Sequence, residues 1–147
     1  MKCNYCGAEA VLRDATYIYH DNKSKFYGKV WVCSNYPKCD SYVGCHYGTT
    51  VPKGRLANPR LRCLKMEAHK QFDPIWKSGL KKRRQAYKWL AEKLEIPVED
   101  CHIGMFDVKD CQRVIHLCRK FDDPLVSQYR KEHYSNRPVF TRGYNHN

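Results

Sequence analysis

Apolar residues recur at three- and four-residue intervals along the chain after residue 58, which is the spacing of an amphipathic helix. This pattern predicts helices over residues 59–72, 81–94 and 108–118. Polar and charged residues fill the positions between, so each predicted helix has one apolar face to bury. The apolar positions are Leu61, Leu64, Ala68 and Phe72; Tyr87, Leu90, Ala91 and Leu94; and Val108, Cys111, Val114, Ile115 and Cys118.

Two of these helices carry recognisable start signals. Asn58 precedes Pro59; asparagine accepts hydrogen bonds from first-turn amides, and proline suits the first helical position. Asp107 precedes the third helix, and a second acid, Asp110, follows three residues later. The signals predict helix starts at residues 59 and 108.

The first fifty residues lack this helical spacing and are rich in aromatic and β-branched residues. Residues 15–19 and 30–32 are short runs of this kind, which is typical of strands. The Asp21–Asn22 pair and Gly28 mark turns between them. The pattern therefore predicts two short antiparallel strands.

Four cysteines flank the predicted strands. Cys3 and Cys6 have two residues between them, and Cys33 and Cys39 have five. Two such pairs joined by a strand-rich stretch suit a tetrahedral Zn²⁺ ion, which takes four thiolates at about 2.3 Å. The spacing predicts a zinc ribbon in which these four residues are the metal ligands.

Two alternatives to this ligand set remain open. Cys45 or His46 could replace Cys39, although Cys39 closes a compact second knuckle and is preferred. Two disulfides would also use four cysteines, but the chain has nine cysteines, an odd count. Met1-Lys2-Cys3 leads directly into the first knuckle, so we expect no signal peptide, and no apolar run is long enough to span a bilayer. We expect a cytoplasmic protein, where thiols stay reduced, from a bacterium or its phage.

The second knuckle, Cys33-Ser34-Asn35-Tyr36-Pro37-Lys38-Cys39, follows a predicted strand and an earlier Cys-x-x-Cys-Gly. In this it resembles the four-cysteine zinc fingers at the C-terminus of bacterial type I topoisomerases. The resemblance covers about the first forty residues. It implies binding of single-stranded DNA, partly through exposed aromatic side chains, and implies nothing about topoisomerase catalysis.

The chain carries a formal net charge of +12, and the excess is concentrated in its middle third. Residues 53–90 hold 12 Lys and Arg against 2 Asp and Glu, whereas residues 91–147 hold 9 of each. Such segregation is expected of a surface that meets phosphates, although a solvated helix face is the plainer interpretation. Residues 81–84 place four cations at a predicted helix start, where the helix dipole favours acids.

These features predict a set of nucleic-acid contacts. Basic residues of the middle third would bind phosphates, and two aromatic residues of the ribbon would stack on unpaired bases. DNA is a better candidate than RNA, with single-stranded or distorted DNA first. The predicted phosphate contacts are Lys53, Arg60, Arg62, Lys81, Lys82, Arg83 and Arg84, and the predicted stacking residues are Phe26 and Tyr36.

Several motifs spread over residues 1–120 resemble a family of small zinc-finger-containing proteins from phages and bacteria. The resemblance implies one zinc site and one structural unit over this length. It does not imply any enzymatic reaction. The motifs are Gly44-Cys45-His46-x-Gly48-Thr49, Leu56-Ala57-Asn58, Phe72-Asp73-Pro74-Ile75-Trp76, Ala86-Tyr87-x-Trp89-Leu90-Ala91 and His102-Ile103-Gly104-Met105-Phe106-Asp107.

Together the patterns predict an α+β protein, with a zinc ribbon of short antiparallel strands packed on a small helical part. The expected segments are the ribbon (1–50), a basic helical region and core (51–122) and a polar, mobile tail (123–147). The expected function is nucleic-acid binding around a structural zinc ion. One alternative is a phage-type protein that binds and inhibits a host protein. Another is a metal-dependent nuclease using His102 and Asp107, although the chain shows no paired carboxylates or nucleophile motif.

Overall fold

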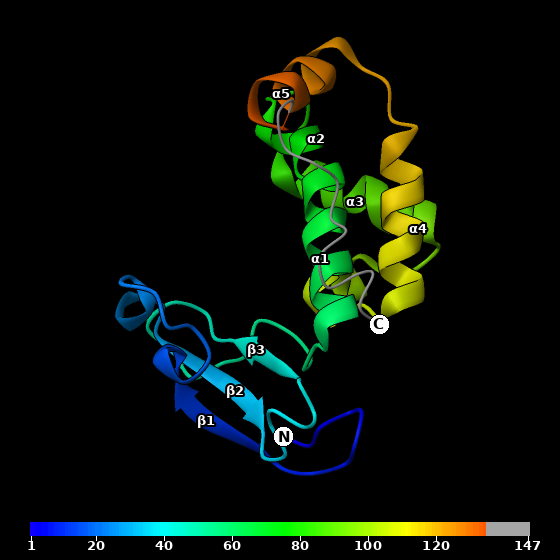
Figure 1. The fold of residues 1–147 in the computed structure, drawn as a ribbon. Coiled ribbons are helices and arrows are strands. Elements are labelled where there is room, and N and C mark those ends of the chain that lie inside the picture. Colours follow the sequence, from blue (N-terminus) through cyan, green and yellow to red (C-terminus); the bar gives the residue numbers. More distant parts are fainter. Residues whose placement is uncertain (135–147) are drawn as a thin grey trace. The chain divides into compact units, whose positions relative to one another are not determined.

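The computed structural model describes residues 1–134 and divides into two compact units, Met1–Arg62 and a second that begins at Cys63. The first unit holds a three-stranded sheet and the second is helical, so the fold is α+β, as predicted (Figure 1). Helix α1 (Pro59–Phe72) begins in the first unit and continues into the second. Among residues 1–134, no helix has both the length and the apolar character needed to cross a bilayer.

The sheet of the first unit is antiparallel and its strands follow chain order. It consists of β1 (Ala10–Asp14), β2 (Lys29–Cys33) and β3 (Tyr42–Gly44). Alternation along β2 sends Val30 and Val32 to one face, where both are buried. Trp31 and Cys33 point to the other face and pack in a separate apolar cluster, which also contains Cys3. The cysteine ligands predicted from the sequence thus lie beside one face of this sheet.

The predicted strand over residues 30–32 is confirmed within β2, but the one over residues 15–19 is wrong. The pairing partner of β2 is Ala10–Asp14, and Ala15–Tyr17 form a 3-10 helix instead. The amide of Ala15 still donates to Gly28 O at 2.8 Å. After that point the amides of Ile18 and Tyr19 both donate to Ala15 O, which turns the chain away from the sheet.

The first unit extends past residue 50 because the following segment pairs back onto the sheet. Pro52 forms an isolated bridge with Cys45, and Ala57 forms one with Tyr42. The Tyr42 and Ala57 backbones exchange two hydrogen bonds, of 3.2 and 3.0 Å. These bonds keep residues 51–58 with the ribbon as far as the start of α1.

Over residues 63–134, the second unit contains the main part of α1 and four further α-helices. These are α2 (Pro74–Lys77), α3 (Arg83–Leu94), α4 (Val108–Arg119) and α5 (Pro124–Tyr134). Both predicted start signals are confirmed: Asn58 Oδ1 accepts from the Leu61 amide and Asp107 Oδ1 accepts from the Asp110 amide, each at 2.9 Å. Helix α3 begins two residues later than predicted, and the Lys82 amide donates to Gln85 Oε1.

The core of the second unit is built from the predicted apolar faces. Phe72 and Leu90 are completely buried, and the Phe72 ring lies 4.7 Å from that of Tyr87. On α4 the predicted positions 111, 114, 115 and 118 are all buried, whereas Val108 is half-buried. The 3.6-residue period therefore identified which faces of α1, α3 and α4 are turned inward.

Helix α5 lies where the sequence predicted a polar tail from residue 123 onward, and over Pro124–Tyr134 this is a correction. Asp123 Oδ1 accepts from the Leu125 amide at the helix start, and Val126 is completely buried. Arg130 donates to Cys118 O and Gln71 O, both at 2.9 Å, so a charged residue ties α5 to α4 and α1. The remainder of the predicted tail, residues 135–147, lies outside the described residues.

The start of α4 permits a test of the helix cap. Replacing Asp107 by Ala removes the acceptor of the Asp110 amide, and we expect the free energy of unfolding to fall by about 1 kcal/mol. Asp107→Asn keeps a capping oxygen and should differ little from the parent. Urea unfolding followed by circular dichroism measures both variants. An equal loss in the two would mean that charge, and not the capping bond, supplies the stabilisation.

Candidate metal centre and basic surface

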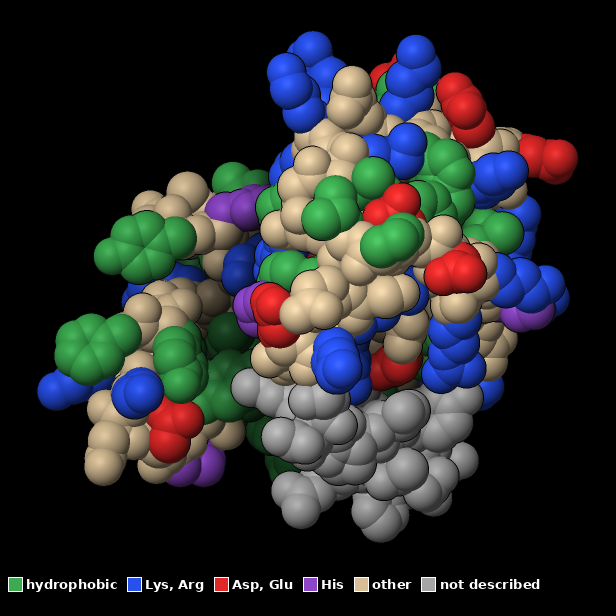
Figure 2. All heavy atoms as spheres, turned by 90° about the horizontal axis from the view of Figure 1, so that it is seen from above, with side chains coloured by type: hydrophobic (Ala, Val, Ile, Leu, Met, Phe, Trp, Pro, Cys, Tyr) green, Lys and Arg blue, Asp and Glu red, His purple; other side chains and the backbone are tan. Residues whose placement is uncertain are grey.

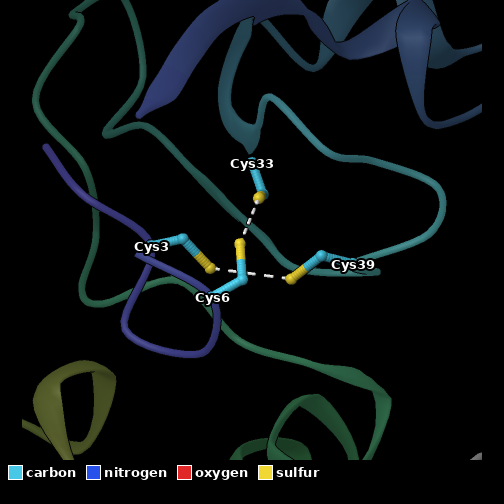
Figure 3. A group of neighbouring side chains, drawn as sticks. All are labelled: Cys3, Cys6, Cys33 and Cys39. Carbon is cyan, nitrogen blue, oxygen red and sulfur yellow. Dashed lines mark hydrogen bonds between the residues drawn. The ribbon is translucent and has the colours of Figure 1, made fainter. Parts of the chain in front are cut away.

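The structure brings Cys3, Cys6, Cys33 and Cys39 into one group, with their sulfur atoms all within 4.8 Å of one another (Figure 3). The Cys3 and Cys39 sulfurs are 3.7 Å apart, and those of Cys6 and Cys33 are 3.4 Å apart. A tetrahedron with metal–sulfur bonds of about 2.3 Å has edges of about 3.8 Å. The four sulfur atoms therefore stand at nearly the separations that a tetrahedral zinc ion requires.

Each cysteine pair is presented by a tight turn. In the first, the Gly7 amide donates to Cys3 O at 2.9 Å, and Gly7 has φ 78°, a left-handed conformation that glycine adopts without strain. In the second, Cys33 ends β2, and the Cys39 amide donates to Asn35 O at 2.9 Å to close the longer loop. The five-residue spacing thus forms a second knuckle, as the sequence predicted.

The fourth member of the group is Cys39, and the alternatives Cys45 and His46 lie outside it. Cys45 is buried at the end of β3, where its amide donates to Lys29 O and burial raises the pKa of its thiol. His46 is exposed in the following turn. Cys45 forms a bridge with Pro52 across this turn, and the Lys53 amide donates to Gly44 O at 2.9 Å.

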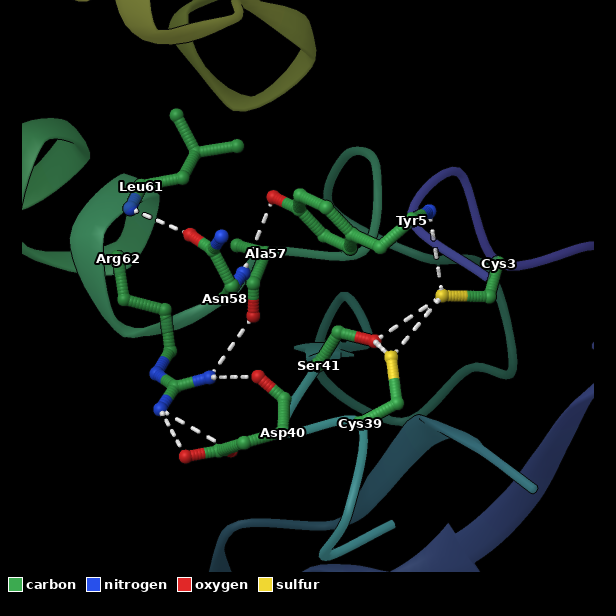
Figure 4. A network of polar contacts seen from close by, with 9 residues as sticks. All are labelled: Cys3, Tyr5, Cys39, Asp40, Ser41, Ala57, Asn58, Leu61 and Arg62. Atoms are coloured by element: carbon green, nitrogen blue, oxygen red, sulfur yellow. Dashed lines mark hydrogen bonds and ion pairs between the residues drawn. The ribbon is translucent and has the colours of Figure 1, made fainter. Parts of the chain in front are cut away.

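Donors surround the tetrad at hydrogen-bond distance from its sulfurs. The Tyr5 amide donates to Cys3 Sγ and the Asn35 amide donates to Cys33 Sγ, each at 3.4 Å. The Asn35 side-chain amide lies 3.5 Å from Cys6 Sγ. The hydroxyl of Ser41 lies 3.2 Å from Cys3 Sγ and 3.6 Å from Cys39 Sγ (Figure 4). Neither Asn35 nor Ser41 was predicted as part of the site; the signal in the sequence was a polar residue inside or just after the second knuckle.

The pKa values of the Cys3 and Cys39 thiols shift in opposite directions, because burial, hydrogen bonds and neighbouring sulfurs act differently on the two. Burial would raise the pKa of the Cys3 thiol, but hydrogen bonds from Ser41 and from the Cys6 and Tyr5 backbone outweigh it and lower that pKa to about 6. Ser41 also lowers the pKa of Cys39, yet burial and the neighbouring sulfurs of Cys3, Cys6 and Cys33 raise it to about 12. Four thiolates can coexist here only when a cation offsets their charge, which is what a bound divalent metal does.

The predicted phosphate contacts are distributed over both units. Lys53 and Arg60 are exposed in the first unit. In the second unit, Arg83 and Arg84 stand exposed in the first turn of α3, which contains no acid. Lys82 is exposed immediately before that turn, and Lys81 is half-buried.

Arg83 is held by two aromatic rings. Its guanidinium carbon lies 4.9 Å from the centre of the Tyr87 ring and 5.5 Å from that of Trp76. Lys77 contacts the same Trp76 ring at 5.5 Å. Rings of this kind attract cations and limit their motion, so Arg83 is partly ordered in the absence of a ligand.

Arg62, another predicted phosphate contact, is already bound within the first unit (Figure 4). Its guanidinium donates to Asp40 Oδ1 at 3.2 Å and to Ala57 O at 2.8 Å. It also lies 4.1 Å from the centre of the Tyr42 ring. These contacts join the second knuckle to the start of α1, and they occupy the guanidinium that the sequence assigned to a phosphate.

The two predicted stacking residues differ in exposure. Phe26 is 68% exposed, and Lys25 Nζ lies 5.1 Å from its ring centre. Tyr36 is half-buried, with its ring centre 5.9 Å from that of Tyr17 and 6.2 Å from that of Tyr42. Phe26 therefore offers more free ring surface than Tyr36.

His102 and Asp107 are the two residues that the nuclease alternative requires. His102 is exposed, and the Asp107 carboxylate accepts from the Asp110 amide as a helix cap. Within residues 1–134, the cysteine tetrad is the only group of three or more His, Cys, Asp or Glu side chains that could hold a metal ion.

A family model described as a zinc-finger-containing domain matches residues 1–121. The match covers the cysteine tetrad and the helices as far as the end of α4. Neither the curated proteins nor the solved structures include a match to this chain. The tetrad geometry and the family agree on Zn²⁺.

Proposed function

The chain belongs to the family of zinc-finger-containing domains, and we propose that it binds nucleic acid through exposed cations and aromatic side chains, with single-stranded or distorted DNA as its preferred ligand. The zinc ion has a structural role, since four cysteine side chains occupy all positions of a tetrahedral site and leave none for substrate.

The cation cluster at the start of α3 carries this proposal. Lys82, Arg83 and Arg84 are exposed, and the first turn contains no acid to neutralise them. Positive charge here opposes the helix dipole, which costs about 0.3–1 kcal/mol for each cation near the terminus. A phosphate backbone would reverse this cost, because it places negative charge beside both the cations and the positive end of the helix dipole.

The preference for unpaired DNA rests on the aromatic residues. Phe26 combines an exposed ring with a neighbouring Lys25, so it can stack on a base while the lysine meets a phosphate. Base stacking on such rings is worth about 1–3 kcal/mol per base. Tyr36 is the second stacking residue, with less free surface. Lys53 and Arg60 add exposed cations to the same unit.

The test is binding of fluorescent single-stranded DNA, duplex DNA and RNA to the zinc-loaded full chain, titrated over salt. We expect the affinity to be higher for single-stranded DNA than for duplex DNA. We also expect log affinity to fall linearly with the logarithm of the salt concentration. Replacing Lys81, Lys82, Arg83 and Arg84 by Ala should weaken binding. It should also make the salt slope shallower by about 3, because each phosphate contact on a single strand contributes about 0.7.

A matched control separates a specific surface from net charge. Lys and Arg side chains (blue) protrude at several places on the face drawn in Figure 2, so cations are not confined to α3. Replacing the exposed Lys93, Lys109, Lys120 and Lys131 by Ala removes the same charge elsewhere in the second unit. The proposal requires a clearly smaller effect from this control. If the two variants lose affinity equally, the attraction to DNA is nonspecific and depends on net charge alone. If the parent protein binds no nucleic acid at low salt, a protein partner becomes the better hypothesis.

A further inference from the structure

Ser41 contacts three of the four cysteines of the tetrad, although the spacing of the cysteines gives no sign of its role. Its side chain is completely buried between Cys3 and Cys39 (Figure 4), with the hydroxyl 3.2 Å and 3.6 Å from their sulfurs. Its amide donates to Cys39 O at 2.9 Å, and its carbonyl accepts from the Cys33 amide at 3.0 Å. One residue thus makes hydrogen bonds or close polar contacts with three of the four cysteines.

The direction of the hydroxyl bond follows from the charge of its neighbours. A metal-bound cysteine is a thiolate and can only accept, so Ser41 must be the donor. The hydroxyl has a single hydrogen, and the shorter distance assigns it to Cys3. The tetrad with one zinc ion has a formal charge of about −2, and donors that point at the sulfurs offset part of it.

We propose that Ser41 is a positioning residue of the zinc site, whose hydroxyl hydrogen-bonds the Cys3 thiolate and thereby sets the affinity and electronic character of the bound metal. The proposal does not depend on nucleic-acid binding. Partners that orient metal ligands typically change metal affinity by about 10- to 100-fold when removed. Asn35 supplies a comparable but longer contact to Cys6, at 3.5 Å and from an exposed residue.

The first experiment compares zinc affinity in the full-length parent, Ser41→Ala and Asn35→Ala, by competition with a coloured chelator under reducing conditions. We expect the zinc dissociation constant to rise about 10-fold in Ser41→Ala. Asn35→Ala should raise it only about threefold, because a longer and more exposed hydrogen bond contributes less. A change below twofold in Ser41→Ala would overturn the proposal.

Cobalt substitution gives a second readout that packing alone would not move. A thiolate that loses a hydrogen bond is more electron-rich, so its charge-transfer band to Co²⁺ should shift to lower energy in Ser41→Ala. If Ser41 acts only by filling space, the band stays where it is in the parent, and the proposal fails.

One further pair of variants, Ser41→Thr and Ser41→Val, covers the case in which Ser41→Ala does not fold. Thr and Val have nearly the same shape but differ in the hydroxyl. We expect Ser41→Thr to bind zinc more tightly than Ser41→Val and to keep the cobalt band closer to that of the parent. Equal affinities and equal bands in the two variants would show that the hydroxyl does not act on the metal.

Discussion

Removing zinc from Cys3, Cys6, Cys33 and Cys39 is expected to unfold the first unit. Met1–Arg62 contains a three-stranded sheet and small apolar clusters, one of which includes three of the ligands. A single hydrophobic core in a domain of this size rarely supplies more than about 3–5 kcal/mol, and a structural metal is a common addition. Structural zinc contributes about 10–16 kcal/mol of apparent binding free energy in small fingers, more than such a core supplies.

The variant that tests this is Cys3→Ser, because Cys3 is buried and its sulfur is a member of the tetrad. We expect bound zinc to fall from one ion per chain to none, with loss of the strand signal in circular dichroism. Chelation under reducing conditions, or lowering the pH, should act in the same direction, because chelators remove the ion and protons compete for the thiolates.

Cys45→Ser is the matched control for this experiment. It makes the same atomic change at another buried cysteine of the same unit, outside the tetrad. It should retain one zinc ion and the strand signal. A Cys3→Ser protein that still binds zinc with the parent's affinity would contradict the four-cysteine site, as would loss of zinc in Cys45→Ser alone.

Replacing Phe72 by Ala is expected to destabilise the second unit by about 3–5 kcal/mol. Phe72 is completely buried at the end of α1, so its removal leaves a cavity among α1, α3 and their neighbours. The substitution also removes the contact between the Phe72 and Tyr87 rings, whose centres lie 4.7 Å apart. A loss of this size is a large fraction of the 5–15 kcal/mol by which domains are usually stable.

Urea unfolding followed by helical circular dichroism measures the effect, and the midpoint should fall while the slope is unchanged. Met66→Ala is the control, because Met66 lies on the same helix but is 54% exposed. We expect a change within about 0.5 kcal/mol for that variant. Similar losses in both variants would contradict a core-packing role for Phe72, because Ala has a higher helix propensity than either Phe or Met.

The two units have different sources of stability. In the first, the metal joins two turns that the sheet alone would leave with little apolar contact. In the second, buried apolar faces of α1, α3, α4 and α5 pack together. The exposed cations at the start of α3 lie outside both the metal site and the apolar core, and the helix dipole opposes them, although Arg83 contacts the rings of Trp76 and Tyr87. This is why we attribute them to a ligand, and why their removal should affect binding more than folding.

The features that the sequence alone determined depend on local spacing. Two close cysteine pairs predicted the tetrad, because each tight turn needs only neighbouring residues to present its two sulfurs. The period of apolar residues predicted the inward faces of α1, α3 and α4. Asn58 and Asp107 predicted helix starts, because a cap bonds an amide three residues away. In each case the cause lies within a few residues of its effect.

Tertiary structure decided the features that depend on residues distant in the chain. Residues 15–19 have strand-forming side chains, but β2 pairs with Ala10–Asp14, and pairing rather than propensity defines a strand. Helix α5 forms because Val126 is buried and Arg130 donates to Gln71 O on α1 and to Cys118 O on α4, although the segment is polar in sequence. Arg62 appears in the sequence as one cation among many, yet Asp40 and Tyr42 bind it. Ser41 became part of the metal centre for the same reason, since only folding brings its hydroxyl to the sulfur of Cys3.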